Sequence, residues 1–228
     1  MIRLDSIVKR YGQDINDPLA VDNVTIEFDY GKLYAIVGKS GSGKTTLLNI
    51  IAGLLSPTSG YIYLDGVDIS NYNEKEKAAY RNKKIGYVFQ SFYLEPKMSV
   101  LDNVCLPMII AGEKKNVREE KAKVILEQLG LLEYLGKKVS KMSGGEQQRV
   151  AIARALINDA SIILADEPTG NLDTQNGIAV MEEIKRLSNA GKLVILVTHN
   201  LEHAHKYADV ILELSDGKII REEINENY

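Results

Sequence analysis

The chain has 228 residues, of which 45% are hydrophobic and 26% charged, a balance typical of one or two soluble globular domains. Its formal net charge is −3, so bulk electrostatics gives no indication of a nucleic-acid partner. There is no run of 18 or more apolar residues, and we therefore expect no membrane-spanning helix.

The N-terminal residues 1–12 contain no long apolar segment, so we expect no signal peptide. Cys105 is the one cysteine, which excludes an intrachain disulfide and suits a reducing compartment. It lies in an apolar stretch, and we expect a packed side chain rather than a nucleophile.

Residues 2–11 and 19–30 alternate in short β-like bursts. This pattern predicts an antiparallel edge layer that leads into the next strand. Tyr11 ends the first burst, and its ring would either stack on an adenine base or be a half-buried edge tyrosine. The residues alone favour neither interpretation.

Residues 33–55 are the stretch around which the rest of the chain is organised. Residues 34–37 form a short apolar run, typical of a strand covered on both faces. Residues 44–55 are apolar around most of a helical circumference, typical of a core helix. A flexible Gly/Ser linker would not be flanked by two core elements, so the glycine-rich loop between them is expected to bind a ligand.

That loop fits the phosphate-binding P-loop pattern, with Gly38 and Gly43 followed by Lys44 and Thr45. Its glycines let successive N–H groups point at one anion, and the start of the following helix adds its positive dipole end. Lys44 can reach the β- and γ-phosphates, and the Thr45 hydroxyl can ligate Mg²⁺.

The segment after the P-loop helix is punctuated by turns. Residues 57–60 break the helix, residues 61–64 read as a strand, and 65–66 as a hairpin turn. Residues 74–83 are predicted to be a solvated helix and residues 84–90 a strand, which ends at Gln90. A lone glutamine is usually a surface amide.

Residues 91–142 are mainly helical and interrupt the α/β alternation, which predicts a helical insertion. Ser99 is expected to cap a helix over residues 100–110, with Pro107 interrupting it. A second helix over residues 117–129 places its apolar residues on one face.

Residues 143–157 are predicted to form another helix, opening with Ser143-Gly144-Gly145-Glu146. Ser-x-x-Glu is a capping box, which is a sufficient structural reason for Ser143 and Glu146. A cap does not need two adjacent glycines, however, and these also permit close approach of the backbone to a ligand.

Residues 161–165 form an apolar run that ends in Asp166 and Glu167, a place where parallel sheets deliver ligand-binding side chains. Asp166 is placed to bind Mg²⁺, and Glu167 to orient water for attack on the γ-phosphate. The alternative is that two acids simply begin a surface loop.

The last third of the chain reads as a helix over residues 174–187, with Ile178 on its apolar face, and a strand over 193–198. His199 ends that strand, beside the expected phosphates. His203 follows four residues later, but the segment lacks the glutamate of metalloproteases, so a histidine metal site is not expected. Residues 210–220 are predicted to close the fold as a hairpin.

Taken together, these segments resemble the ATPase subunit of ATP-binding cassette (ABC) transporters over essentially the whole chain. The motifs follow the order of that family: GKSGSGKT (38–45), Gln90, SGGEQQR (143–149), IILADE (162–167), NLD (171–173) and His199. The stretches QSFYLEP (90–96) and LADEPTGNLD (164–173) look closest to one branch. It includes ATPases of lipoprotein-releasing, macrolide-export and antimicrobial-peptide-resistance systems and the cell-division ATPase FtsE.

The resemblance implies an α/β fold, with a P-loop NTPase core on a parallel sheet, an antiparallel β layer and a helical insertion. It implies one ABC ATPase domain over residues 1–228, in which residues 1–90 and 143–228 form the core and residues 91–142 a helical subdomain. ATP and Mg²⁺ would be bound between two copies, each P-loop facing the signature segment (143–149) of the other copy.

The family also implies the site residues. Glu167 would be the catalytic base and His199 would hold the γ-phosphate. Thr45, Gln90 and Asp166 would hold Mg²⁺. The remaining contacts, made within one copy or across the dimer, would come from Tyr11, Gly38, Lys39, Ser40, Gly41, Ser42, Gly43, Lys44, Thr45, Thr46, Gln90, Ser143, Gly144, Gly145 and Asp173.

Three positions depart from the family pattern. Met142 replaces a leucine of similar volume, and little effect is expected. Glu146 replaces glutamine and either brings a negative charge near the triphosphate or faces away as the capping-box acid. Lys39 stands where the branch often has proline, and no separate function is assigned to it.

As an ATPase subunit without a membrane segment, the chain would need a separately encoded permease and would lie at the cytoplasmic side of the cell membrane. The family places the docking groove near Gln90. Candidates there are Phe89, Phe92, Tyr93, Leu94, Met98 and Leu101, with Tyr93 and Met98 as the expected exposed pair.

The leading expectation is a homodimeric ATPase that drives export or extraction of a peptide, lipoprotein or drug. The alternative is an FtsE-like mechanotransmission ATPase with no transported substrate. A soluble ABC ATPase acting on nucleic acid usually has paired cassettes, and a non-hydrolysing switch would need neither Glu167 nor His199. No nucleic-acid partner is therefore expected.

Overall fold

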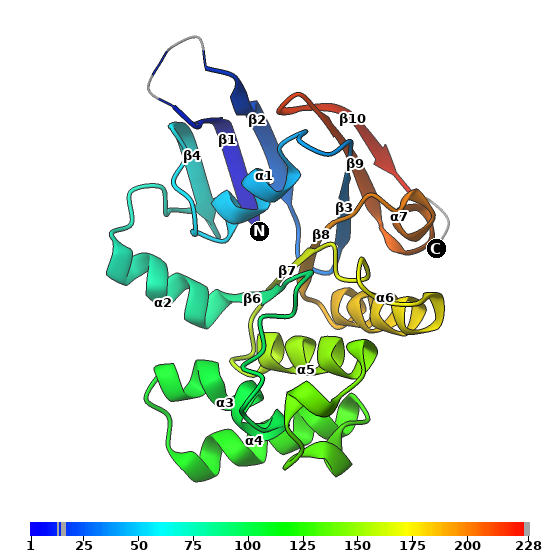
Figure 1. Ribbon diagram of the computed structural model, residues 1–228. Helices are drawn as coiled ribbons and strands as arrows, with labels where there is room; N and C mark the ends of the chain where they lie inside the picture. The colour runs from blue at the N-terminus through cyan, green and yellow to red at the C-terminus, as the bar shows by residue number, and fades with distance from the viewer. Residues whose placement is uncertain (13, 15–16, 226–228) are drawn as a thin grey trace.

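The computed structural model describes residues 1–12, 14 and 17–225, which form two sheets and the helices packed against them (Figure 1). The first sheet is antiparallel and has the strand order β2-β1-β4-β5. Its strands are β1 (Ile2–Arg10), β2 (Leu19–Phe28), β4 (Ser59–Leu64) and β5 (Val67–Asp68). This confirms the predicted antiparallel layer, which also includes the hairpin after the P-loop helix.

The second sheet has the order β10-β9-β3-β8-β7-β6. Its neighbours from β9 to β6 are parallel, and β10 pairs with β9 in the antiparallel direction as the predicted closing hairpin. The strands are β3 (Leu33–Val37), β6 (Ile85–Val88), β7 (Ile162–Asp166), β8 (Leu193–Val197), β9 (Val210–Ser215) and β10 (Lys218–Ile224). Every residue of β3 and β8 is buried, as their continuous apolar runs predicted.

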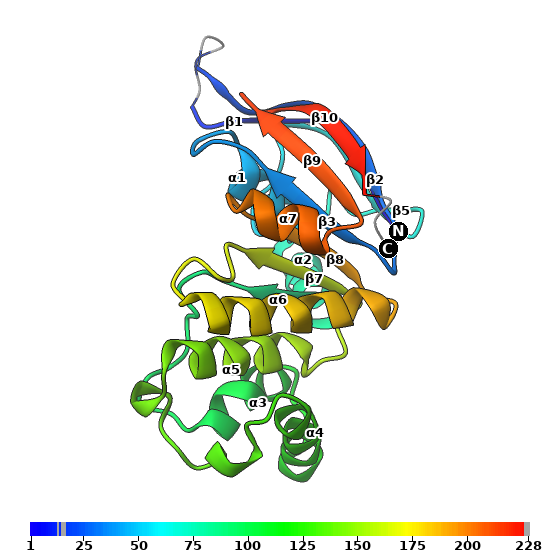
Figure 2. The same ribbon diagram turned by 90° about the vertical axis from the view of Figure 1, so that its right-hand side faces the viewer.

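The α-helices are α1 (Lys44–Ile51), α2 (Glu74–Lys84), α3 (Val100–Ile110), α4 (Lys115–Gln128), α5 (Gly144–Leu156), α6 (Thr174–Asn189) and α7 (Leu201–Tyr207). Two short 3₁₀ helices, η1 (Leu132–Tyr134) and η2 (Val139–Lys141), precede α5. Figures 1 and 2 show α3 and α4 at the end of the molecule away from the antiparallel sheet, with α5 and α6 between.

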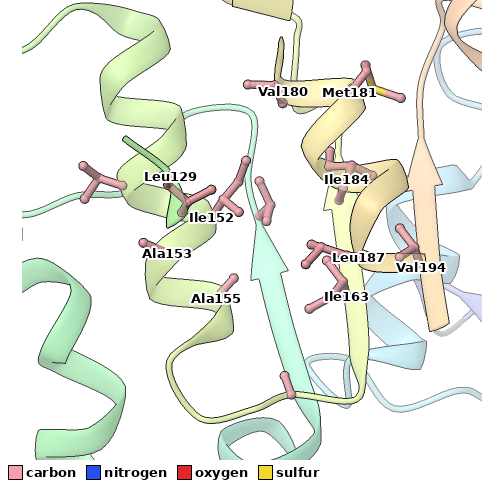
Figure 3. Packing of buried hydrophobic residues seen from close by; sticks show 14 of the residues in the cluster. Leu129, Ile152, Ala153, Ala155, Ile163, Val180, Met181, Ile184, Leu187 and Val194 are labelled. Carbon is pink, nitrogen blue, oxygen red and sulfur yellow. The ribbon is translucent and has the colours of Figure 1, made fainter. Parts of the chain in front are cut away.

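Two hydrophobic clusters hold these layers together. In one, α1 packs its Leu47, Leu48 and Ile51 side chains among residues of the antiparallel and parallel sheets. In the other, α5 and α6 meet the strands β7 and β8, and Figure 3 shows Ile152, Ile184 and Ile163 facing one another there. The first cluster fixes the P-loop helix, and the second fixes the strands that carry the acidic residues.

Residues 91–142 contain α3, α4, η1 and η2, and α5 packs against both α3 and α4 as well as against α6. The helical character of the insertion agrees with the sequence analysis. That residues 91–142 form a separate subdomain, which ends before α5, stays a prediction. Cys105 is buried within α3, as expected of a packed side chain.

Pro107 does not interrupt its helix, contrary to expectation. The α3 helix runs to Ile110 because Ser99 caps it, accepting a hydrogen bond from the Asp102 N–H, and because Val104 and Met108 are buried on either side of the proline. Packing therefore outweighs the one backbone hydrogen bond that proline removes.

Two predicted core residues are also exposed. Leu54 is 51% exposed because α1 ends at Ile51, where Gly53 adopts a left-handed conformation with φ of 66° and turns the chain away. Ile178 is 36% exposed because the buried face of α6 is centred on Gly177 and Val180, which leaves Ile178 at its edge.

Candidate active site

The glycine-rich loop joins the buried strand β3 to α1, as predicted. Gly43 has a φ of 103°, and a Cβ atom there would lie 2.1 Å from the Ala20 carbonyl oxygen, so only glycine fits. The hydroxyl of Ser42 is buried and has no hydrogen-bond partner among the described residues. The loop therefore combines a glycine-dependent curl with an unsatisfied polar group, as expected of a loop shaped for an anion.

Lys44 is held at the mouth of this loop. Its ammonium group donates hydrogen bonds of 2.8 Å to the carbonyl oxygens of Gly38 and Lys39, and the residue is only 9% exposed. Within the described residues no carboxylate forms an ion pair with it. A nearly buried cation without a counter-ion is suited to bind an anionic ligand.

The carboxylates predicted from the sequence meet the loop at the carboxyl ends of the parallel strands. Asp166 is the last residue of β7, and the Thr45 hydroxyl donates a hydrogen bond of 3.3 Å to its Oδ1 atom. Burial raises the pKa of Asp166 above its ordinary value, and the neighbouring Glu167 charge acts in the same direction. Thr45 and Asp166 thus form an oxygen donor pair of the kind that Mg²⁺ prefers when phosphates complete its coordination.

Glu167 follows β7 in a left-handed conformation with φ of 48°, which is uncommon for a residue with a side chain. Its N–H donates to the Val197 carbonyl, and its Oε2 atom lies 2.9 Å from His199 Nδ1. The glutamate side chain is 17% exposed and that of the histidine 72%. Strained, partly buried acids paired with a histidine are typical of catalytic positions.

A cavity of about 550 Å³ is lined by the predicted residues Tyr11, Gln90, Glu167 and His199 and by most of the P-loop, namely Gly38, Ser40, Gly41, Gly43, Lys44, Thr45 and Thr46. Lys39, Ser42 and Asp166 do not line it, although Asp166 is linked to it by the hydrogen bond from Thr45. Ser143, Gly144, Gly145 and Asp173 do not line it. His203 lies apart from it, and the described residues include no group of three or more His, Cys, Asp or Glu side chains that could hold a metal.

The signature segment lies at the start of α5. Ser143 Oγ accepts a hydrogen bond of 3.3 Å from the Glu146 N–H, and the Ser143 N–H donates one of 2.8 Å to Glu146 Oε2. This is the capping box, so Glu146 acts as its acid. A Cβ at Gly145 would lie 2.2 Å from Asn176 Oδ1, whereas one at Gly144 would meet nothing closer than 3.5 Å. Gly145 is therefore needed for packing on α6, and Gly144 is exposed.

Asp173 caps α6, since its carboxylate accepts hydrogen bonds from the N–H and the side-chain amide of Asn176. The backbone hydrogen bond from Asn176 lowers the pKa of Asp173 below its ordinary value. This cap gives Asp173 a structural role, and its contact with a second copy stays a prediction.

Two side-chain contacts that hold the loop after Gln90 were not predicted from the sequence, although Asn171 belongs to the NLD motif. Asn171 Nδ2 donates to the Gln90 carbonyl oxygen at 2.9 Å. The Arg154 guanidinium of α5 donates to the carbonyls of Phe92 and Tyr93, both of which have positive φ. These partners lie 61 to 81 positions away along the chain, so no local pattern could have identified them.

The proposed docking region contains a second cavity, of about 540 Å³, between α2, α3 and the loop after β6. Phe89 and Tyr93 line it, and Tyr93 is 68% exposed, as expected. Met98 is only partly exposed, so the prediction that it is exposed together with Tyr93 is wrong for Met98. Leu94 and Leu101 pack against the hydrophobic core instead.

Asp166→Asn is expected to stabilise the ligand-free protein by about 1 kcal/mol, or about 2–4 °C in melting temperature, at neutral pH. Because burial raises the folded-state pKa of Asp166, its ionised form costs free energy at any pH above that value. The gain should shrink as pH falls through the raised pKa toward the ordinary one. Calorimetry across pH measures this, and equal melting temperatures at neutral pH would contradict it.

Tyr11→Ala is expected to weaken ATP binding by about 1–2 kcal/mol, roughly 5- to 30-fold, if the ring stacks on the base. The ring is 59% exposed, and its hydroxyl lies 3.2 Å from the hydroxyl of Thr46 at the start of α1. Inorganic triphosphate, which has no base, should bind both proteins equally in calorimetric titrations. Tyr11→Phe is the control and should bind ATP like the parent. An equal loss for ATP and triphosphate would instead indicate a phosphate-side defect.

A family model described as ABC transporter matches residues 21–170. The chain is 44% identical over 220 residues to an uncharacterized ABC transporter ATP-binding protein of Methanocaldococcus jannaschii, covering 96% of this chain and 98% of that protein. It is 41% identical to the probable syringafactin export ATP-binding/permease protein SyfD of Pseudomonas syringae, over 99% of this chain and 34% of the relative. It therefore spans about a third of that longer protein.

Solved structures agree in fold. A dimeric post-hydrolysis state of the ATP-binding cassette MJ0796, bound to ADP and Pi, matches with a TM-score of 0.90 at 38% identity over the full length of both chains. A second dimeric structure of the same cassette also matches with a TM-score of 0.90, at 39% identity.

Proposed function

We propose, since this chain belongs to the ABC transporter family as an ATP-binding and ATP-hydrolysing subunit, that two copies close head to tail around two ATP molecules and thereby drive a membrane partner.

One observation carries the two-copy arrangement. The cavity at the P-loop is lined by phosphate-binding and acidic groups of one chain, but by none of Ser143, Gly144 or Gly145. The N-terminus of α5, whose first N–H groups lack intrahelical partners, therefore remains available for the nucleotide of another copy. In a dimer with two-fold symmetry, each chain would supply its P-loop to one nucleotide and the N-terminus of its α5 to the other. The dimeric cassettes among the structural relatives support it.

Each side chain has a role that its position supports. Lys44 binds the β- and γ-phosphates, and Tyr11 stacks on adenine. Glu167 accepts the proton of the attacking water, and His199, held by Glu167, contacts the γ-phosphate. Mg²⁺ bound at Thr45 and Asp166, with Gln90 nearby, would neutralise charge that develops on the phosphate oxygens.

The membrane partner is proposed to be a separate permease that docks at the cavity beside Tyr93. None of the helices in the described ranges has the length and hydropathy needed to cross a bilayer. In SyfD and in the macrolide export protein MacB of Campylobacter jejuni, a similar cassette is named together with a permease in one protein. By analogy, we place this chain on the cytoplasmic face of the membrane, exporting a peptide, lipoprotein or drug.

Affinity purification of the Glu167→Gln chain from solubilised native membranes with ATP tests this function. The substitution should hold the ATP-bound state, and a permease should co-purify. Lys44→Met, which should not bind ATP, is the matched control for nucleotide-dependent capture. Recovery of soluble proteins, ribosomes or nucleic acid without any membrane protein would contradict the transporter proposal. A partner with no transport path would favour mechanotransmission instead of export.

A further inference from the structure

Three side chains form a cluster beside the N-terminus of α5: Tyr134, Lys137 and Glu146. Lys137 Nζ lies 3.9 Å from Glu146 Oε2 and 4.6 Å from the centroid of the Tyr134 ring. The lysine side chain is 34% exposed and the glutamate 19%. The backbone of Lys137 is also fixed, since its N–H donates to the Tyr134 carbonyl and its carbonyl accepts from the N–H of Val100. The fixed backbone keeps the lysine within ion-pair distance of Glu146.

Glu146 brings a negative charge to a surface that, in the proposed dimer, faces a triphosphate. The hydrogen bond from the Ser143 N–H lowers the pKa of Glu146, so the carboxylate is ionised at neutral pH. Arg149, one turn further along α5, acts on this charge more weakly than Lys137 does. Without a nearby cation, the negative charge of the carboxylate would cancel part of the positive potential with which the N-terminus of α5 attracts a phosphate.

The capping box itself leaves phosphate donors available. Because Ser143 Oγ accepts from the Glu146 N–H, the hydrogen of its own hydroxyl is left to donate outward. The N–H groups of Gly144 and Gly145 in the first helical turn likewise have no intrahelical partner. Glu146 thus orders the donors that a phosphate needs while adding a charge that repels it.

We propose that Lys137 is a positioning residue for ATP hydrolysis, which neutralises Glu146 so that the N-terminus of α5 can accept the γ-phosphate of ATP bound to a second copy. This inference rests on the proposed dimer. It assigns Lys137 an electrostatic function through Glu146 and requires no contact of its own with the nucleotide.

The proposal predicts opposite signs for two single substitutions. Lys137→Met keeps the aliphatic stem on Tyr134 but removes the charge, and should weaken the ATP-bound dimer roughly 5- to 20-fold, since each dimer contains two such sites. Glu146→Gln leaves the lysine uncompensated and should tighten the dimer a few-fold. The double substitution should return the dissociation constant close to that of the parent.

Sedimentation equilibrium with ATP, in the Glu167→Gln background, measures these constants. Lys137→Arg should preserve the affinity, and Lys138→Met, at the exposed neighbouring lysine, is the matched control and should not change it. Raising the salt concentration should shrink the effect of Lys137→Met, which loss of packing would not do.

The outcomes separate the two proposals. If the Glu167→Gln chain with Lys137 intact forms no ATP-dependent dimer, the proposed function fails. If that dimer forms but Lys137→Met leaves its dissociation constant unchanged, or if the double substitution stays as weak as Lys137→Met alone, the role of Lys137 is wrong.

Discussion

Glu167→Gln is expected to bind ATP as tightly as the parent chain and to hydrolyse it at least about 100-fold more slowly. Glutamine has the shape of glutamate and can still reach His199, which lies 2.9 Å from the present carboxylate. It cannot accept the proton of an attacking water, so only the chemical step is lost. The phosphate-binding loop and Lys44 are untouched, so the affinity for ATP should not change.

Steady-state phosphate release and equilibrium nucleotide binding together measure this effect. Glu202→Gln is a suitable control, because Glu202 is an exposed acid three residues beyond His199 and does not line the nucleotide cavity. It should hydrolyse ATP at the parental rate. Near-parental hydrolysis by Glu167→Gln would remove Glu167 from the role of base.

Lys44→Met is expected to weaken ATP binding by roughly 100-fold or more and so to abolish hydrolysis at ordinary ATP concentrations. Two carbonyl oxygens at 2.8 Å position the ammonium group, and each hydrogen bond that it would donate to a charged phosphate contributes about 1.5–3 kcal/mol. Methionine fills the same space without a charge. Because removal of a nearly buried cation offsets the loss of these two hydrogen bonds, the ligand-free variant should melt close to the parent.

Isothermal titration and thermal melting test both halves of this expectation. Lys32→Met is the control, since Lys32 precedes the opposite end of the same strand and forms only a surface ion pair with Asp29. Its ATP affinity should equal that of the parent. Parental ATP affinity in Lys44→Met would contradict the binding role, and a large loss of stability would show that the lysine is structural.

Periodicity and motif spacing predicted most of the architecture. The buried strands β3, β7 and β8 are continuous apolar runs, and the P-loop, the acidic pair and His199 each follow one of them, so parallel pairing brings these residues to one edge. That is why Lys44, Asp166, Glu167 and His199 could be placed from their neighbours along the chain.

The differences from prediction arise where packing or backbone geometry, rather than hydrophobic periodicity, decides the outcome. Pro107 stays in its helix because residues on both sides of it are buried, and Leu54 is exposed because Gly53 ends α1 early. The two alternatives set out for Glu146 do not exclude each other, since it closes the capping box and its charge also lies beside the N-terminus of α5. Arg154 and Asn171 hold the loop after Gln90 through side chains that no local pattern connects to it.

The head-to-tail arrangement is tested most directly by cross-linking two variant chains. Each variant has one introduced cysteine, at a different position. Both carry Glu167→Gln; one has Lys39→Cys within the P-loop, and the other has Lys141→Cys just before the signature segment. The natural Cys105 is buried and should react little. With ATP and a short thiol cross-linker, we expect a product that joins one chain of each kind, formed in the mixture but by neither chain alone. Cross-linking of a single kind of chain, or none although ATP-bound dimers form, would contradict the head-to-tail arrangement.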